Sequence, residues 1–206
     1  MRTCKFYLRK FQDNLETELP GTAGSMKMVD VYKPHLHTPP HWFVSNAIYI
    51  VTGSTLDKKL LLNSEEKCRQ FCETLISRAG LLKWSLDAWA VMPNHYHFVA
   101  RSPENAVTLK SLIQGVHSIS AKFVNQMDAT PGRRVWHNYW DTCIRSETSY
   151  YARLQYVMMN PVKHGLVQNP EDYQFSSYKY FLESSESELQ GKVLSCYGDA
   201  QIADDF

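Results

Sequence analysis

Hydrophobic and polar positions follow a regular order from residue 46 onward. Residues 46–54 (NAIYIVTGS) are rich in β-branched and aromatic side chains and include a glycine near their end, which predicts a β-strand. Residues 64–80 then carry apolar side chains at intervals of three and four, behind the N-cap candidate Ser64, which predicts an amphipathic helix. The folded part of the chain is therefore expected to open with a strand and a helix.

The same order continues toward the C-terminus. Residues 84–91 and 95–101 predict two strands joined by a turn that contains proline and asparagine. Residues 106–127 have the apolar spacing of a second helix, and residues 134–145 predict a fourth strand after a Pro-Gly turn. A third helix is expected to begin after Ser146 and to end before Pro161, because the residue that precedes a proline is biased away from helical backbone angles.

Strand, helix, strand, strand, helix, strand is the element order of the ferredoxin-like fold. The predicted class is therefore α+β, with an antiparallel sheet, helices packed on one face, and one additional C-terminal helix. Residues 1–44 are proline-rich near their end and predict an irregular lead-in, residues 45–182 predict the folded domain, and residues 183–206 predict an acidic flexible tail.

Charge is distributed unevenly along a chain whose net charge is only +1. Residues 183–206 hold six acidic side chains against Lys192 alone, which leaves a net charge of +6 on residues 1–182. A basic body of this kind suits an anionic partner, nucleic acid among them, although many other proteins share it.

Neither a membrane span nor a secretory signal is expected. No apolar stretch approaches the roughly 20 residues that cross a bilayer, and the N-terminus carries charges throughout. The five cysteines are widely spread and do not form the paired spacing of a zinc cluster. These features predict reduced thiols in a cytoplasmic protein that has no membrane partner.

The candidate chemistry begins with His95 and His97 in the predicted strand 95–101. Side chains two residues apart in a strand point to the same face, so the two imidazoles aim together and Tyr96 faces the other way. Two converging imidazoles provide half of a metal site. A pair of hydrogen-bonded histidines at the edge of a sheet is the alternative interpretation.

Tyr156 and Asn160 stand four residues apart on the third predicted helix and so share one helix face. Asn160 offers a carbonyl oxygen as a third ligand, with a phenol beside it. Taken alone, a tyrosine on an amphipathic helix is more often a packing residue.

Together these motifs resemble the single-tyrosine (Y1) transposases of the HUH type, and among them most the REP-associated tyrosine transposases. The motifs that carry the resemblance are AWAVMPNHYHFV, which includes the two histidines, and YVMMNPVKHGLV, at residues 156–167. The resemblance extends over about residues 40–182 in the order of the family.

The resemblance implies an enzyme that cleaves and rejoins single-stranded DNA, as a transposase and an endonuclease-ligase. Tyr156 would be the nucleophile and form a 5′-phosphotyrosine, while His95, His97 and Asn160 would hold Mg²⁺ or Mn²⁺. The expected partner is single-stranded or hairpin DNA from repeated palindromes, bound by a monomer or a homodimer.

Basic and aromatic residues near these motifs are candidates for DNA binding, and solvated charges and core aromatics are the alternative interpretation. They are Arg133, Arg134, Trp136, Tyr139, Arg145, Arg153 and Lys163.

Two other functions remain possible from the residues. A catalytically silent nucleic-acid-binding module could use the same fold, and a metal-dependent phosphoesterase could use water in place of Tyr156. A histidine-triad hydrolase is disfavoured because Val99 stands where a third histidine would be.

Overall fold

The computed structural model describes residues 44–196. The predicted lead-in, except for its last residue, and the end of the predicted acidic tail lie outside the described residues. Within the described part, the secondary structure is α+β, as the residue pattern predicted.

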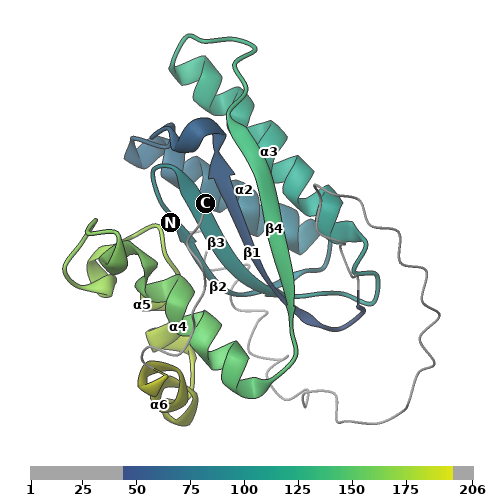
Figure 1. Ribbon diagram of the computed structural model, residues 1–206, viewed down its shortest axis with the longest axis vertical. Coiled ribbons are helices and arrows are strands. Elements are labelled where there is room, and N and C mark those ends of the chain that lie inside the picture. The colour runs from purple at the N-terminus through teal and green to yellow at the C-terminus, as the bar shows by residue number, and fades with distance from the viewer. Residues whose placement is uncertain (1–43, 197–206) are drawn as a thin grey trace. The chain divides into compact units, whose positions relative to one another are not determined.

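One antiparallel sheet organises the described residues (Figure 1). Its strand order is β2-β3-β1-β4, so β3 and β1 are the central strands and β2 and β4 the edges. The strands are β1 (Ile48–Thr55), β2 (Ser85–Val91), β3 (His95–Arg101) and β4 (Trp136–Ile144). This order is the one expected when two strand-helix-strand units interleave in a ferredoxin-like sheet.

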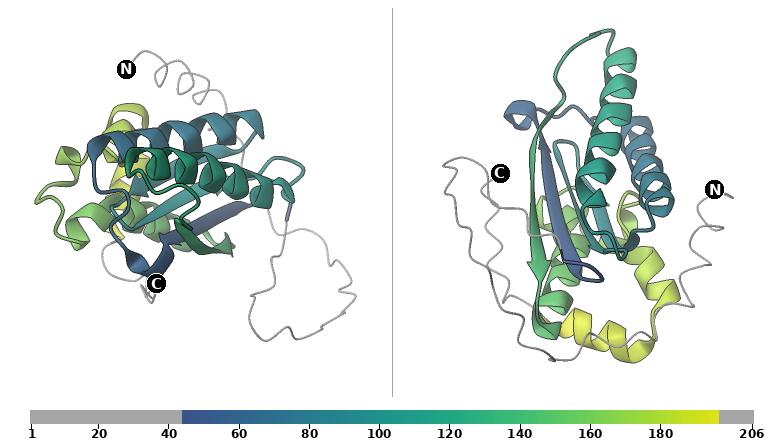
Figure 2. Two further views of the ribbon diagram at one scale, coloured as in Figure 1. Left: turned by 90° about the horizontal axis from the view of Figure 1, so that it is seen from above. Right: turned by 90° about the vertical axis from the view of Figure 1, so that its right-hand side faces the viewer.

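Helices α2 (Glu65–Leu81) and α3 (Thr108–Met127) cover one face of the sheet (Figure 2). Side chains alternate between the faces of a strand, and Tyr96 of β3 points toward this helical layer. Its ring lies 4.7 Å from that of Phe71 on α2 and also occupies the space above Gly53, where an added Cβ would come within 2.5 Å of the ring. A residue without a side chain is therefore required at position 53 for Tyr96 to be buried.

Helix α4 (Glu147–Lys163) lies on the opposite face. Ile50 of β1 and Val99 of β3 point to this second face and share an apolar cluster with Val157 and Met158 of the helix. The cluster also includes residues from two short helices, α5 (Tyr178–Ser184) and α6 (Ser187–Ser195). Two 3-10 turns, η2 (Leu56–Lys58) and η3 (Pro170–Asp172), complete the described elements.

The predicted end of the third helix before Pro161 is wrong, because α4 continues through Pro161 to Lys163. Proline cannot donate a hydrogen bond to the preceding turn, but its fixed φ angle is compatible with a helix. The helix ends only two residues later, at Lys163, with His164 as its C-cap, so few helical hydrogen bonds are affected.

The predicted flexible tail from residue 183 is also wrong in part. Residues Ser187–Ser195 form α6, where Val193 is fully buried in the apolar cluster beneath α4. The side chain of Gln155 on α4 donates a hydrogen bond to the carbonyl of Leu194, 3.3 Å away. The high Ser and Glu content of this segment predicted flexibility, although its few apolar residues pack this helix against the domain.

None of the helices within residues 44–196 is both long enough and apolar enough to span a membrane.

Candidate active site

The two histidines of β3 lie side by side on the face that α4 covers. Their ring centroids are 5.1 Å apart, and His97 is almost completely buried. Tyr96, between them, points to the other face, as strand alternation requires. The sequence prediction for the direction of these side chains is confirmed.

Helix α4 brings Tyr156 and Asn160 to the same place. The ring of Tyr156 is 5.2 Å from that of His97, and Oδ1 of Asn160 is 3.2 Å from Nε2 of His95. All four residues singled out in the sequence therefore meet in one site, although they come from two elements about 60 residues apart. Their roles in catalysis remain predictions.

Neighbouring side chains fix the orientation of both imidazoles. Nδ1 of His97 is 2.7 Å from the hydroxyl of Thr52 on β1, and Nδ1 of His95 is 2.7 Å from Oδ1 of Asn94. The amide nitrogen of Asn94 donates to the carbonyl of Lys58, which is consistent with its oxygen facing His95. In both histidines the partner at Nδ1 leaves Nε2 for the site, the arrangement typical of metal-binding histidines.

Burial keeps both imidazoles neutral. Desolvation lowers the pKa of His95 to about 4, with the side-chain amide of Asn160 acting in the opposite direction. Desolvation also holds the pKa of the more deeply buried His97 well below its ordinary value, and the nearby His95 adds to the effect. Neutral imidazoles are the form that binds metal ions.

A neutral His95 faces two amide oxygens with only one N–H to donate. The shorter contact, to Asn94, takes this proton, so Nε2 of His95 and Oδ1 of Asn160 meet as two lone pairs when the Asn160 amide has this orientation. Two ligands of one small octahedral cation lie about 3.0 Å apart when each is about 2.1 Å from it. The observed 3.2 Å is therefore suitable for a shared divalent cation.

The phenol of Tyr156 is half-buried at the edge of the site. Burial raises the pKa of its hydroxyl, whereas the side-chain amide of Asn160 and the positive charge of Arg153 lower it. The ammonium of Lys163 lies 5.2 Å from the centre of the Tyr156 ring. Arg153 and Lys163, both predicted to bind DNA, thus lie beside the candidate nucleophile.

His164, Thr52 and Asn94 belong to the site but were not singled out in the sequence. The ring of His164 is 4.7 Å from that of His95, at the exposed C-cap of α4. The spacing of eight residues between Tyr156 and His164, about two helical turns, was an available signal for His164. Thr52 could be found only from the pairing of β1 with β3, where it stands opposite His97.

The prediction that Trp136 stacks on nucleic-acid bases is wrong. Trp136 is buried, its indole nitrogen donates to the hydroxyl of Ser120, and its ring stacks on His117 at 4.7 Å. Tyr139 stands opposite Gly53 on β1 and therefore faces the layer of α2 and α3, away from His97.

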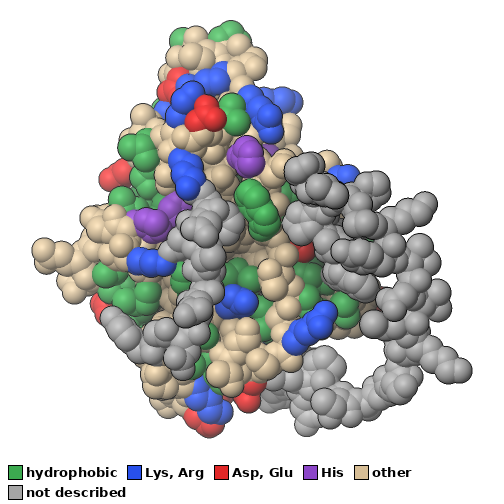
Figure 3. Space-filling model, viewed as in Figure 1, with side chains coloured by type: hydrophobic (Ala, Val, Ile, Leu, Met, Phe, Trp, Pro, Cys, Tyr) green, Lys and Arg blue, Asp and Glu red, His purple; other side chains and the backbone are tan. Residues whose placement is uncertain are grey.

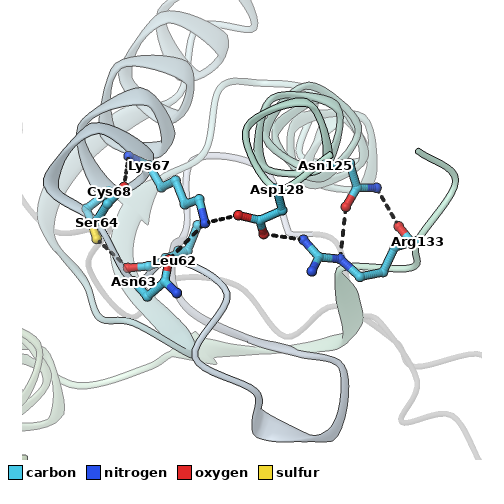
Figure 4. Close-up of polar contacts among 8 residues, drawn as sticks. All are labelled: Leu62, Asn63, Ser64, Lys67, Cys68, Asn125, Asp128 and Arg133. Atoms are coloured by element: carbon cyan, nitrogen blue, oxygen red, sulfur yellow. Dashed lines mark hydrogen bonds and ion pairs between the residues drawn. The ribbon is translucent and has the colours of Figure 1, made fainter. Parts of the chain in front are cut away.

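Arg133 belongs to a polar network within the folded domain (Figure 4). Its guanidinium donates to Asp128 at 2.6 Å and to Asn125 at 3.0 Å, and Asp128 also pairs with the buried Lys67 of α2 at 2.6 Å. This network joins the start of α2 to the end of α3, which argues against a primary role for Arg133 in DNA binding.

Trp140 is the aromatic residue of β4 that shares a face with the site. It stands opposite Thr52, so one strand separates it from His97, and its half-buried ring stacks on that of the exposed His137 at 6.0 Å. Strands are spaced by about 4.8 Å, which places Trp140 about 10 Å from His97. Of the remaining predicted DNA contacts, Arg134 and Arg145 are exposed.

Figure 3 presents the side of the molecule on which α4 and β4 face the viewer in Figure 1. Lys and Arg side chains are spread over its visible part, with fewer acidic side chains among them. No group of three or more His, Cys, Asp or Glu side chains in residues 44–196 could hold a metal ion, so the candidate site depends on the amide of Asn160 in addition to two histidines.

The sequence and the fold are each similar to those of tyrosine transposases. No protein-family model matches the sequence. The chain is 29% identical over 96 residues to the REP-associated tyrosine transposase of Escherichia coli (strain K12). This match covers 46% of this chain and 54% of that protein. The chain is also 27% identical over 100 residues to a putative REP-associated tyrosine transposase of Haemophilus influenzae, which covers 44% and 57%.

A solved structure of a REP-associated tyrosine transposase bound to a REP hairpin has the same fold, with a TM-score of 0.60, 20% identity, and coverage of 72% of this chain and 86% of that one. The chain matches about half the length of the curated relatives. The resemblance to the Y1 transposases, and to the REP-associated tyrosine transposases in particular, is confirmed.

Proposed function

We propose that this protein cleaves single-stranded DNA and transfers the strand through a covalent bond to Tyr156. The observation that carries the proposal is the position of the Tyr156 ring, 5.2 Å from His97, in a site that also contains His95 and Asn160. The curated relatives are named as tyrosine transposases, which supports the same chemistry.

The phenolic oxygen of Tyr156 attacks the phosphorus of a phosphodiester and loses its proton to solvent or a nearby base. The bond from phosphorus to the 3′ oxygen breaks, and that oxygen leaves as a 3′-hydroxyl after taking up a proton. The product is a 5′-phosphotyrosine. Attack by another 3′-hydroxyl reverses these steps, releases the tyrosine and joins two DNA strands.

A tyrosine suits strand transfer because a phenol has a pKa of about 10 and leaves more readily than a sugar hydroxyl. The covalent bond to the protein conserves the phosphodiester for a second exchange. Attack by water would lose it.

His95, His97 and Asn160 fit a divalent cation, Mg²⁺ or Mn²⁺. The fit rests on the neutral imidazoles and on the two lone pairs that meet 3.2 Å apart. Such an ion would polarise the phosphoryl group and offset negative charge in the transition state. Because all three ligands are neutral, we expect binding to strengthen when a DNA phosphate adds its charge.

The proposed substrate is single-stranded or hairpin DNA. A relative of the same fold is described as bound to a REP hairpin. The exposed Arg134 and Arg145 could contact phosphates, and Trp140 replaces Trp136 as the candidate for base stacking because it shares the face of His97.

Incubation of the protein with hairpin oligonucleotides and Mg²⁺, followed by intact-protein mass spectrometry, tests the proposal. We expect a nucleotide adduct that maps to Tyr156 and is abolished in Tyr156→Phe. Tyr151→Phe on the same helix is the matched control, because its hydroxyl bonds to Glu147 and not to the site. Binding without an adduct would favour a silent module, and cleavage that survives Tyr156→Phe would favour a phosphoesterase that uses water.

A further inference from the structure

Asp87 on β2 is a largely buried carboxylate outside the active site. Its Oδ2 accepts a hydrogen bond from the hydroxyl of Tyr150 on α4 at 3.1 Å and lies 3.6 Å from the guanidinium of Arg101 on β3. Its side chain is only 12% exposed. Two strands and the tyrosine-bearing helix therefore meet at one polar contact.

The sheet is locally irregular at this position. Leu86 pairs with Ala100, and Ala88 pairs with Val99, so Asp87 is an extra residue in β2 with no partner position on β3. An extra residue of this kind forms a β-bulge, which redirects a side chain away from the regular alternation. Here the bulge directs the Asp87 carboxylate toward α4.

The remaining contacts of α4 with β2 are apolar and involve small side chains. Ala88 and Ala90 of β2 lie in the same cluster as Leu154 and Val157 of the helix. Apolar contacts are not directional, and a surface of alanines offers few ridges for a helix to lock into. A hydrogen bond to a charged group fixes both distance and direction.

We propose that Asp87 and Tyr150 are positioning residues that set the height and rotation of α4, and through it the place of Tyr156 beside His97. The proposal rests on the proposed function, because Tyr156 is its nucleophile. Tyr150 precedes Tyr156 by six residues, which correspond to about 9 Å along the helix axis. A displacement of about 1 Å of a reacting group can reduce a rate by about 100-fold, so a fixed point at this distance matters for the chemistry.

The burial of Asp87 is costly, which suggests a role beyond stability. Desolvation raises the pKa of the carboxyl to about 6, while Arg101 and the Tyr150 hydroxyl act in the opposite direction. Arg101 from β3 and Tyr150 from α4 are the charged and titratable groups that face it from the described residues packed against it. Ionisation of Asp87 above pH 6 provides the strongest acceptor for both neighbours, and protonation below pH 6 weakens the contact.

The test compares Tyr150→Phe, which removes one hydroxyl, with Tyr151→Phe, which removes the neighbouring hydroxyl that bonds within α4. The rate of covalent adduct formation on hairpin DNA is measured in single turnover, with DNA affinity and Tm recorded alongside. We expect Tyr150→Phe to lower the rate by 10- to 100-fold with unchanged DNA affinity, and Tyr151→Phe to keep the wild-type rate. The wild-type rate should fall as the pH drops through 6. The rate of Asp87→Asn should not show this fall.

A wild-type rate in Tyr150→Phe, or a rate that falls only in proportion to DNA affinity, would overturn the proposal. Hydrogen exchange of the α4 amides provides a readout that does not depend on chemistry, with faster exchange expected in Tyr150→Phe and not in Tyr151→Phe. If the wild-type protein forms no adduct, the proposed function fails, and unchanged exchange in Tyr150→Phe separately rejects the positioning role.

Discussion

The hydroxyl of Thr52 determines which ring nitrogen of His97 faces the site. The Thr52 side chain lies 2.7 Å from Nδ1 of His97, and by accepting a hydrogen bond from that nitrogen it directs Nε2 into the site. Partners of this kind hold the ring in place and select its tautomer, and their removal commonly weakens metal binding 10- to 100-fold.

We therefore expect Thr52→Val, which keeps the shape of the side chain, to weaken Mn²⁺ binding by about 10-fold or more in the presence of hairpin DNA. Calorimetry or Mn²⁺ electron paramagnetic resonance measures this affinity. Thr142→Val is the control, because Thr142 is an exposed threonine of β4 that stands opposite Ile50. Equal Mn²⁺ affinity in the two variants would contradict the assigned role of Thr52.

At the same scale, sequence reasoning found the four central residues because their spacing is local. Two residues in a strand and four in a helix each determine a shared face. It failed for Trp136, because exposure depends on contacts with Ser120 and His117 on α3, which the β4 sequence does not contain. It missed Trp140, whose place beside the site depends on the pairing of β4 with β1.

Among the elements, α4 connects the fold to the chemistry, and its beginning is capped. The hydroxyl of Ser146 accepts a hydrogen bond from the backbone N–H of Ser149 at 3.2 Å. Helix α2 begins in the same way, where the hydroxyl of Ser64 accepts from the N–H of Lys67 at 3.3 Å. Both caps satisfy a helix N–H group that has no partner within the helix.

Ser146→Ala is expected to lower the free energy of unfolding by about 1 kcal/mol, and Ser64→Ala by a similar amount. Chemical denaturation measures both. The two variants are matched, because each loses the same kind of cap and differs only in the helix affected. A loss below a few tenths of a kcal/mol in Ser146→Ala would show that the cap of α4 does not stabilise the folded chain.

The beginnings of α2 and α4 were predictable from these serines, whereas two C-terminal features were not. Pro161 suggested an early stop, yet a helix that is about to end tolerates a proline in its last turn. The serine- and glutamate-rich segment suggested disorder, yet Val193 provides a buried contact for α6. In both cases tertiary packing outweighed a local preference.

For the folded molecule, the buried charge of Asp87 makes stability depend on pH. The ordinary pKa of an aspartate is 3.8, and burial raises that of Asp87 to about 6. Between these values the folded chain binds the proton more tightly than the unfolded chain does, so the contribution of this group to stability falls as the pH rises through the window. The stabilisation is complete below about pH 4 and lost above about pH 6.

Asp87→Asn should therefore remove a pH-dependent difference on the order of 3 kcal/mol, the equivalent of about two pKa units. The measurement is the difference in unfolding free energy between wild type and variant, taken at several values from pH 4 to pH 8. The wild type should lose stability relative to the variant as the pH rises. A difference that stays constant over this range would contradict the raised pKa.

The overall topology followed from the sequence, because the order of strands and helices leaves few arrangements for a four-stranded antiparallel sheet. The bulge at Asp87 did not follow, since it depends on a pairing between distant segments.

The location of β3 in the interior of the sheet has a consequence for the proposed transfer of DNA strands. Ladder hydrogen bonds to β2 on one side and to β1 on the other hold the backbone that carries the two imidazoles. Helix α4 has no such ladder and rests on side chains alone. In the proposed strand transfer, one DNA end departs and another arrives; we expect the two histidines to keep their place and the room for the exchange to come from displacement of the helix that carries the phenol.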